Sequence, residues 1–97
     1  MPVSDEIRRR ISAAHQEALR VGDSPLRADQ LAARIAELSG AVAGEADVTD
    51  ETRARLRAAL ADAERVLRRD DDGREAARHL QAAERLTEER PRKEWPF

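Results

Sequence analysis

Residues 49–73 read TDETRARLRAALADAERVLRRDDDG, and this stretch decides the fold that the sequence predicts. Thr49 precedes two acidic residues, which is typical of a helix start. Its hydroxyl can accept from a free backbone N–H, and carboxylates are favourable near the positive end of the helix dipole. The aspartates before Gly73 predict the end of a helix of about 20 residues, roughly 30 Å long. Its apolar residues recur at spacings of four, three and four, the period of one helix face: Leu56, Leu60, Ala63 and Leu67.

The chain after this stretch predicts another helix on the same principle. Asp72 is a suitable N-cap, and Glu75, three residues later, completes the sequence pattern of a capping box. Pro91 marks the end of the helix, because proline lacks the N–H group that a continuing helix requires. The face that we expect to be buried consists of Ala76, Leu80, Ala83 and Leu86.

Two further helices are predicted before this stretch. Ser4 is the expected N-cap of the first helix, which we expect to end at Gly22, and Ser24, followed by a proline, is the expected N-cap of the second. Two glycines lie within residues 39–48, so this range is expected to be the longest and loosest connection. The expected buried faces are Ile7, Ile11, Ala14, Ala18 and Val21 in the first helix, and Ala28, Leu31, Ile35, Leu38 and Val42 in the second.

The charged residues outside these faces predict ion pairs along the helix surfaces. An acidic residue four positions before a basic one supports a helix by a few tenths of a kcal/mol. The sequence contains this spacing in two of the four predicted helices. The predicted pairs are Asp5–Arg9, Glu6–Arg10, Glu51–Arg55 and Glu64–Arg68.

The sequence predicts an all-α fold, because no segment alternates with a period of two and β-branched residues are sparse. We expect a small up-down bundle of four helices, made of two antiparallel helical hairpins. The bundle domain is predicted to cover residues 1–90, and an extended C-terminal tail residues 91–97. Alanine supplies nineteen of the 97 residues. The predicted core is therefore thin for this length. Either the helices pack closely through alanine, or a second copy or another protein completes the core, and we expect a homodimer.

The overall composition limits the compartment and the chemistry. Charged residues make up 39 % of the chain, the net charge is −2, and cysteine is absent. Without cysteine there are no disulfides and no thiolate chemistry. No apolar run is as long as a membrane span, which needs about 18 residues. The N-terminus lacks the apolar region of a secretory signal. We therefore expect a cytoplasmic protein that does not contact a membrane.

Candidate catalytic and metal-binding residues do not form any recognised pattern. Glu75 and His79 share a helix face, but no further motif supplies the remaining ligands of a metal site. The consecutive aspartates before Gly73 lack the spacing of a calcium-binding loop. His15 is expected at the edge of the core, and the glycines are scattered singly rather than gathered in a phosphate loop. We predict no catalytic residue, no metal, no cofactor, no small-molecule substrate and no enzymatic activity.

The distribution of charge disfavours nucleic acid as a class of partner. The residues Arg8, Arg9 and Arg10 point in different directions around a helix, and acidic neighbours offset their charge. The second arginine cluster, which consists of Arg53, Arg55 and Arg57, is expected to be solvated in the same way. The acidic net charge differs from the basic footprint of a nucleic-acid-binding domain. A small helical DNA-binding regulator, with a helix-turn-helix at the first predicted turn, is kept as an alternative function.

The tail PRKEWPF, residues 91–97, contains both aromatic residues of the chain. Two prolines favour an extended path. Aromatic side chains and arginine dominate the binding energy of many interfaces. Three interpretations stay open: the tail packs on its own bundle, docks on a partner, or is processed. The residues predicted to bind a partner are Arg92, Lys93, Trp95, Pro96 and Phe97.

The sequence thus favours a non-catalytic protein–protein interaction module, either an adaptor or a regulatory subunit, that docks through its aromatic tail. A second alternative rests on the arrangement of helices followed by a short aromatic segment. In that architecture alone, the chain resembles a ribosomal peptide precursor with a helical leader and a modified C-terminal core. The resemblance implies that an enzyme would modify the tail.

Overall fold

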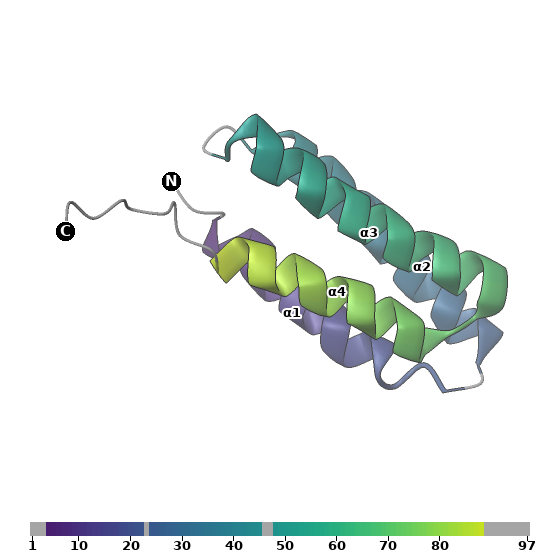
Figure 1. Ribbon diagram of the computed structural model, residues 1–97. Coiled ribbons are helices and arrows are strands. Elements are labelled where there is room, and N and C mark those ends of the chain that lie inside the picture. Colours follow the sequence, from purple (N-terminus) through teal and green to yellow (C-terminus); the bar gives the residue numbers. More distant parts are fainter. Residues whose placement is uncertain (1–3, 23, 46–47, 89–97) are drawn as a thin grey trace.

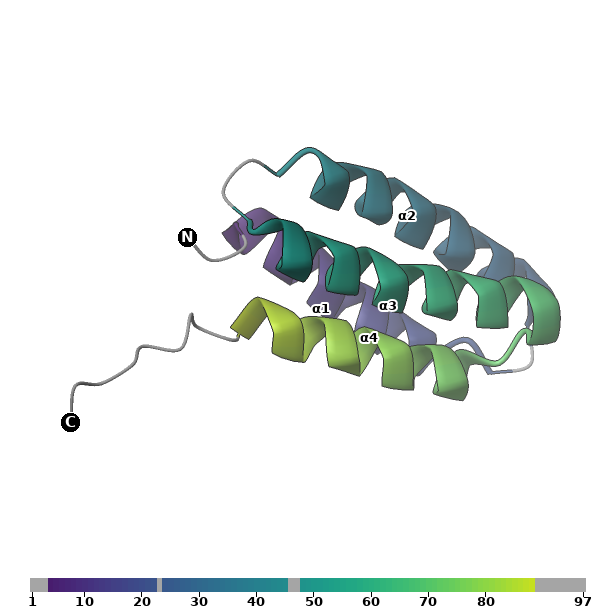
Figure 2. The same cartoon turned by 45° about the horizontal axis from the view of Figure 1, so that its top comes forward.

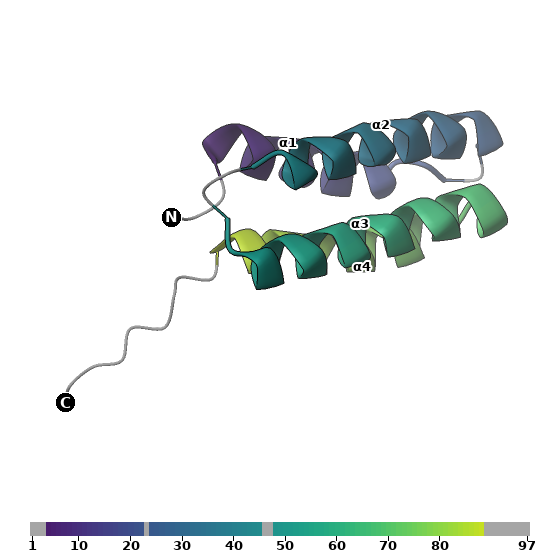
Figure 3. The same ribbon diagram turned by 90° about the horizontal axis from the view of Figure 1, so that it is seen from above.

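The computed structural model describes residues 4–22, 24–45 and 48–88, and it confirms the predicted all-α bundle. Within these ranges the chain forms α1 (Asp5–Ala18), α2 (Pro25–Ala43), α3 (Asp50–Asp70) and α4 (Gly73–Glu88). Successive helices run antiparallel, and α4 returns to pack beside α1 (Figure 1). Seen from above, the α1–α2 hairpin forms one layer on the α3–α4 hairpin (Figure 3). The five predicted partner-binding residues of the tail lie outside the described residues.

The four predicted N-caps are confirmed by side-chain hydrogen bonds. Ser4 Oγ accepts from the backbone N–H of Ile7 at 3.3 Å, and Ser24 Oγ from that of Arg27 at 3.3 Å. The other two N-caps are Thr49, whose Oγ1 accepts from Thr52 at 3.2 Å, and Asp72, whose Oδ1 accepts from Glu75 at 3.1 Å. Each bond satisfies one of the backbone donors that a helix start leaves free.

The predicted capping box at α4 is only half formed. Asp72 makes its bond, but the Glu75 carboxylate pairs with Arg78 at 3.3 Å and with His79 at 3.7 Å on its own helix. Both partners are cationic or can become so by protonation. The opposite charge and the i,i+3 and i,i+4 spacing favour this arrangement.

Two helix ends differ from the prediction. α1 ends at Ala18 rather than at Gly22, and the chain then turns through Gly22, whose φ of 58° is left-handed. α2 continues past Gly40 to Ala43, so the predicted loose connection over residues 39–48 is shorter than expected. A glycine costs a helix only about 1 kcal/mol, and the burial of Val42 in the core outweighs that cost.

The predicted apolar faces of all four helices meet in one core. Every residue assigned to them is buried except Leu86, which is partly buried. The core also contains four residues that the pattern did not include: Ala32, Val48, Ala77 and Thr87. The predicted homodimer stays a prediction, since these contacts all lie within one chain.

Two of the four predicted surface ion pairs are confirmed. Arg55 lies 2.8 Å from Glu51, and Arg68 lies 2.9 Å from Glu64. In the first turn of α1 the pairing differs, because Arg8 lies 3.7 Å from Asp5 at a spacing of three. The predicted pairs Asp5–Arg9 and Glu6–Arg10 are therefore wrong, which leaves Arg10 available for another role.

Candidate functional site

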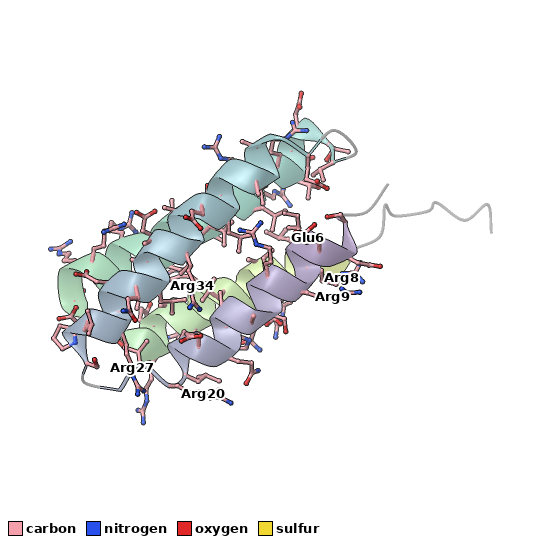
Figure 4. The ribbon with its side chains drawn as sticks, turned by 180° about the vertical axis from the view of Figure 1, so that it is seen from behind. Glu6, Arg8, Arg9, Arg20, Arg27 and Arg34 are labelled. Atoms are coloured by element: carbon pink, nitrogen blue, oxygen red, sulfur yellow. The ribbon has the colours of Figure 1, made fainter. Side chains whose placement is uncertain are left out.

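The interface between α1 and α2 contains a groove of about 260 Å³. Among the four adjacent helix pairs, α1 and α2 contact each other least. α1 contributes Arg10, Ala13 and Ala14 to the groove, and α2 contributes Arg34, Glu37 and Leu38. Figure 4 shows the two helices from this side. We call this feature the α1–α2 groove.

The α1–α2 groove has an apolar floor and a charged rim. Ala14 and Leu38 are buried in the core, and they form the floor. Arg34 and Glu37 are exposed, and Arg10 is partly buried, so all three keep their charged ends near solvent. The space arises because alanines on α1 leave a gap where larger side chains would interdigitate with α2. An apolar floor with a few polar groups around it is the usual composition of a binding groove.

An ion pair joins the two helices at one end of the groove. Arg34 Nη1 lies 3.2 Å from Glu17 Oε1, with the side chains 67 % and 47 % exposed. Near the α1–α2 turn, Arg27 Nη1 donates to the backbone oxygen of Arg20 at 3.2 Å (Figure 4). Exposed pairs of this kind contribute at most about 1 kcal/mol. They therefore hold the rim loosely, and a bound group can displace them at little cost.

The other side of α1 is held against α4 by a different contact. His15 Nδ1 lies 2.5 Å from Glu84 Oε1, and the two side chains are only 18 % and 22 % exposed. His15 thus lies at the edge of the core, as predicted, and its partner comes from α4. The two sides of α1 therefore differ: one carries the groove, and the other carries a shielded hydrogen bond.

We expect the His15–Glu84 contact to appear as a coupling energy between the two positions. A hydrogen bond in a protein contributes about 0.5–1.5 kcal/mol to the free energy of unfolding. When two residues are in contact, the effect of the double substitution differs from the sum of the single effects by a similar amount. The measurement is urea unfolding of His15→Ala, Glu84→Ala and the double variant. Purely additive losses would mean that the contact does not stabilise the bundle.

Arg53 is a structural residue rather than part of a solvated cluster. Its guanidinium donates to Asp50 at 2.7 Å and to the backbone oxygens of Glu45 and Val48 at 2.5 and 3.0 Å. These bonds tie the α2–α3 connection to the first turn of α3. The prediction of a solvated arginine cluster is therefore wrong for Arg53, because helix periodicity does not reveal these loop carbonyl acceptors.

The described residues support no metal site. His79 lies 3.7 Å from Glu75 on the same face of α4, as the spacing predicted. Across residues 4–22, 24–45 and 48–88, no three residues among His, Cys, Asp and Glu are placed to hold a metal ion.

Within the same ranges, no helix is both long enough and apolar enough to cross a membrane.

Comparison with known proteins does not add a family to this geometry. No protein-family model, curated protein or solved structure matches the chain. The candidate site therefore depends on the residues themselves.

The α1–α2 groove is not among the features that the sequence predicts. Its residues Arg10, Ala13 and Glu37 lie beside the apolar stripes rather than in them, so the pattern assigns them to solvated faces. One signal is present in the sequence: small alanines on α1 lie beside the large stripe residues. That signal indicates which face of α1 could border a groove. It does not predict the groove, because the distance between two helices depends on the packing of the whole bundle.

Proposed function

We propose that this chain is a non-catalytic protein–protein interaction module of the cytoplasm, and that it binds its partner through the aromatic tail at residues 91–97. The observation that supports this proposal is the burial of the large apolar side chains within the bundle. The described helices bury nearly all their large apolar side chains in their own core, and the large exposed ones are Leu19 and Leu26, at 57 % and 66 %. The aromatic residues that usually anchor an interface are Trp95 and Phe97.

The charge distribution agrees with a protein partner. The described helices carry acidic and basic side chains in alternation, and many of them pair with each other. Such a surface produces no strong field of one sign, which a nucleic-acid partner would require. The tail adds Arg92 and Lys93 beside its aromatic residues, and these cations suit an acidic rim around an apolar pocket on the partner.

The test is affinity capture from the native host with three forms of the protein: the unchanged chain, the double variant Trp95→Ala/Phe97→Ala, and Leu26→Ala. Leu26→Ala is the matched control, since it removes an exposed apolar side chain from the bundle. We expect the same partner with the unchanged chain and with Leu26→Ala, and loss of that partner with the tail variant. All three forms should keep the helical circular dichroism of the bundle, so that a loss of capture does not reflect a loss of the fold.

Two results would contradict the proposal. Capture of the same partner by the tail variant would show that the tail does not bind it. A mass change on residues 91–97 of the chain recovered from the host would instead favour the precursor alternative.

A further inference from the structure

We propose that the α1–α2 groove is the docking site of this chain's own tail, with the indole of Trp95 lying between Arg10 and Arg34. The groove would then hold the tail when no partner is bound. This regulatory role rests on the proposed function, whereas the docking itself does not. The inference follows from three features: where the described chain ends, what the groove offers, and which residues follow Glu88.

The described chain ends at a point from which the tail can reach the groove. The His15–Glu84 contact places residue 84 of α4 beside residue 15 of α1. Since the two helices run antiparallel, the end of α4 one turn later lies level with the part of α1 that lines the groove. The C-terminal end of α4 and the N-terminal end of α1 lie at the same end of the bundle (Figure 2).

The number of residues after α4 is sufficient for this path. Trp95 is the seventh residue after Glu88. Seven extended residues span at most about 25 Å, whereas half the circumference of a helix about 10–12 Å across is roughly 16–19 Å. The tail can therefore pass around α1 and place Trp95 in the groove.

The groove has the chemistry that an indole requires. Ala14 and Leu38 provide an apolar floor, while Arg10 lines the groove from α1 and Arg34 lines it from α2. A guanidinium over an aromatic face is attracted by the ring, and tryptophan is the best aromatic partner. Glu37, on the same rim, offers a negative charge to Arg92 and Lys93. The apolar floor and the two arginines therefore suit the chain's one tryptophan, and Glu37 suits the two cations that precede it.

Because the tail is covalently connected to the bundle, weak contacts between the tail and the α1–α2 groove are sufficient for docking. A short covalent connection gives the tail an effective concentration in the millimolar range. A second copy reaches that concentration only in very concentrated solution. The tail of the same chain is thus favoured over that of a second copy, and a partner that binds the tail has to compete with the groove.

The first measurement uses the fluorescence of Trp95, the one tryptophan of the chain. We expect its emission to lie to the blue of that of a synthetic peptide of residues 89–97, with weaker quenching by acrylamide. Ala13→Phe fills the groove and should shift both values to those of the peptide. Ala61→Phe, at an exposed position on α3, is the control and should leave them unchanged. Peptide-like values in the unchanged chain would overturn the inference.

The second measurement keeps the groove unchanged, so it does not depend on the folding of Ala13→Phe. Because the chain lacks cysteine, Glu94→Cys carries a single nitroxide label on the tail. We expect faster relaxation of the amides of residues 10–14 and 34–38 in the same molecule. Relaxation seen only between labelled and unlabelled copies would assign the groove to a dimer and overturn docking within one chain. No effect on these amides would overturn the inference altogether.

The two proposals can fail separately. Relaxation of the groove amides without tail-dependent partner capture would reject the proposed function and keep the docking. Tail-dependent capture without relaxation of the groove amides would reject the docking and keep the function. If both hold, Ala13→Phe should increase the affinity for the captured partner, because the tail no longer has to leave the groove. An unchanged affinity would overturn the regulatory role.

Discussion

Replacing Leu60 with alanine is expected to lower the free energy of unfolding by about 2–5 kcal/mol. Leu60 lies in the middle of the buried face of α3 and is 0 % exposed. α3 packs against both α2 and α4, so a cavity at this position removes contacts from several helices at once. The measurement is urea unfolding followed by circular dichroism, at equal protein concentrations.

The control for this prediction is Leu26→Ala. It removes the same atoms from a side chain that is 66 % exposed, so a change within about 0.5 kcal/mol is expected. A similar loss of stability for both variants would mean that the four helices do not enclose the core described above.

Gly73→Ala is expected to destabilise the bundle by about 1–3 kcal/mol, which is the usual cost of forcing extra atoms into a packed site. An added Cβ at Gly73 would clash with the backbone oxygen of Ala18 and would lie 2.8 Å from Cβ of Val21. A backbone oxygen cannot move aside as a flexible side chain can. The start of α4 would therefore have to move away from the end of α1, which thermal or urea unfolding would detect.

Gly40→Ala is the matched control, and its expected effect has the opposite sign. Gly40 lies within α2 and is exposed, and no atom outside its own turn of helix lies within 4 Å of the position that an added Cβ would take. Alanine favours a helix interior by up to about 1 kcal/mol over glycine. The same substitution should therefore stabilise the protein at residue 40 and destabilise it at residue 73. Stabilisation at both positions would contradict the close approach of α1 and α4.

Much of the fold could be predicted because local chemistry and hydrophobic periodicity agree along the chain. Ser4, Ser24, Thr49 and Asp72 are recognisable as N-caps because a helix start requires a side-chain acceptor there. The apolar stripes determine which face of each helix is buried. These features depend on residues close together in sequence.

The features that the sequence did not reveal depend on distant residues. The connection after α2 is shorter than the sequence predicted, because packing of the turn that follows Gly40 outweighs the low helix propensity of glycine. Thr87 is 1 % exposed, and its hydroxyl donates to the backbone oxygen of Glu84 at 2.7 Å, which lets a polar residue enter the core. The α1–α2 groove depends on how far apart two helices lie, and periodicity contains no such distance.

The pairing of α1 with α4 has a consequence for how the chain reaches this structure during synthesis. α3 and α4 are separated by only Asp71 and Asp72, so they can pair soon after both have formed, at a small cost in loop closure. α1 is made before α4, but its contact from His15 to Glu84 joins positions 69 residues apart. Of these four helices, α1 therefore leaves the ribosome before α4, the helix that completes the cover of its apolar face.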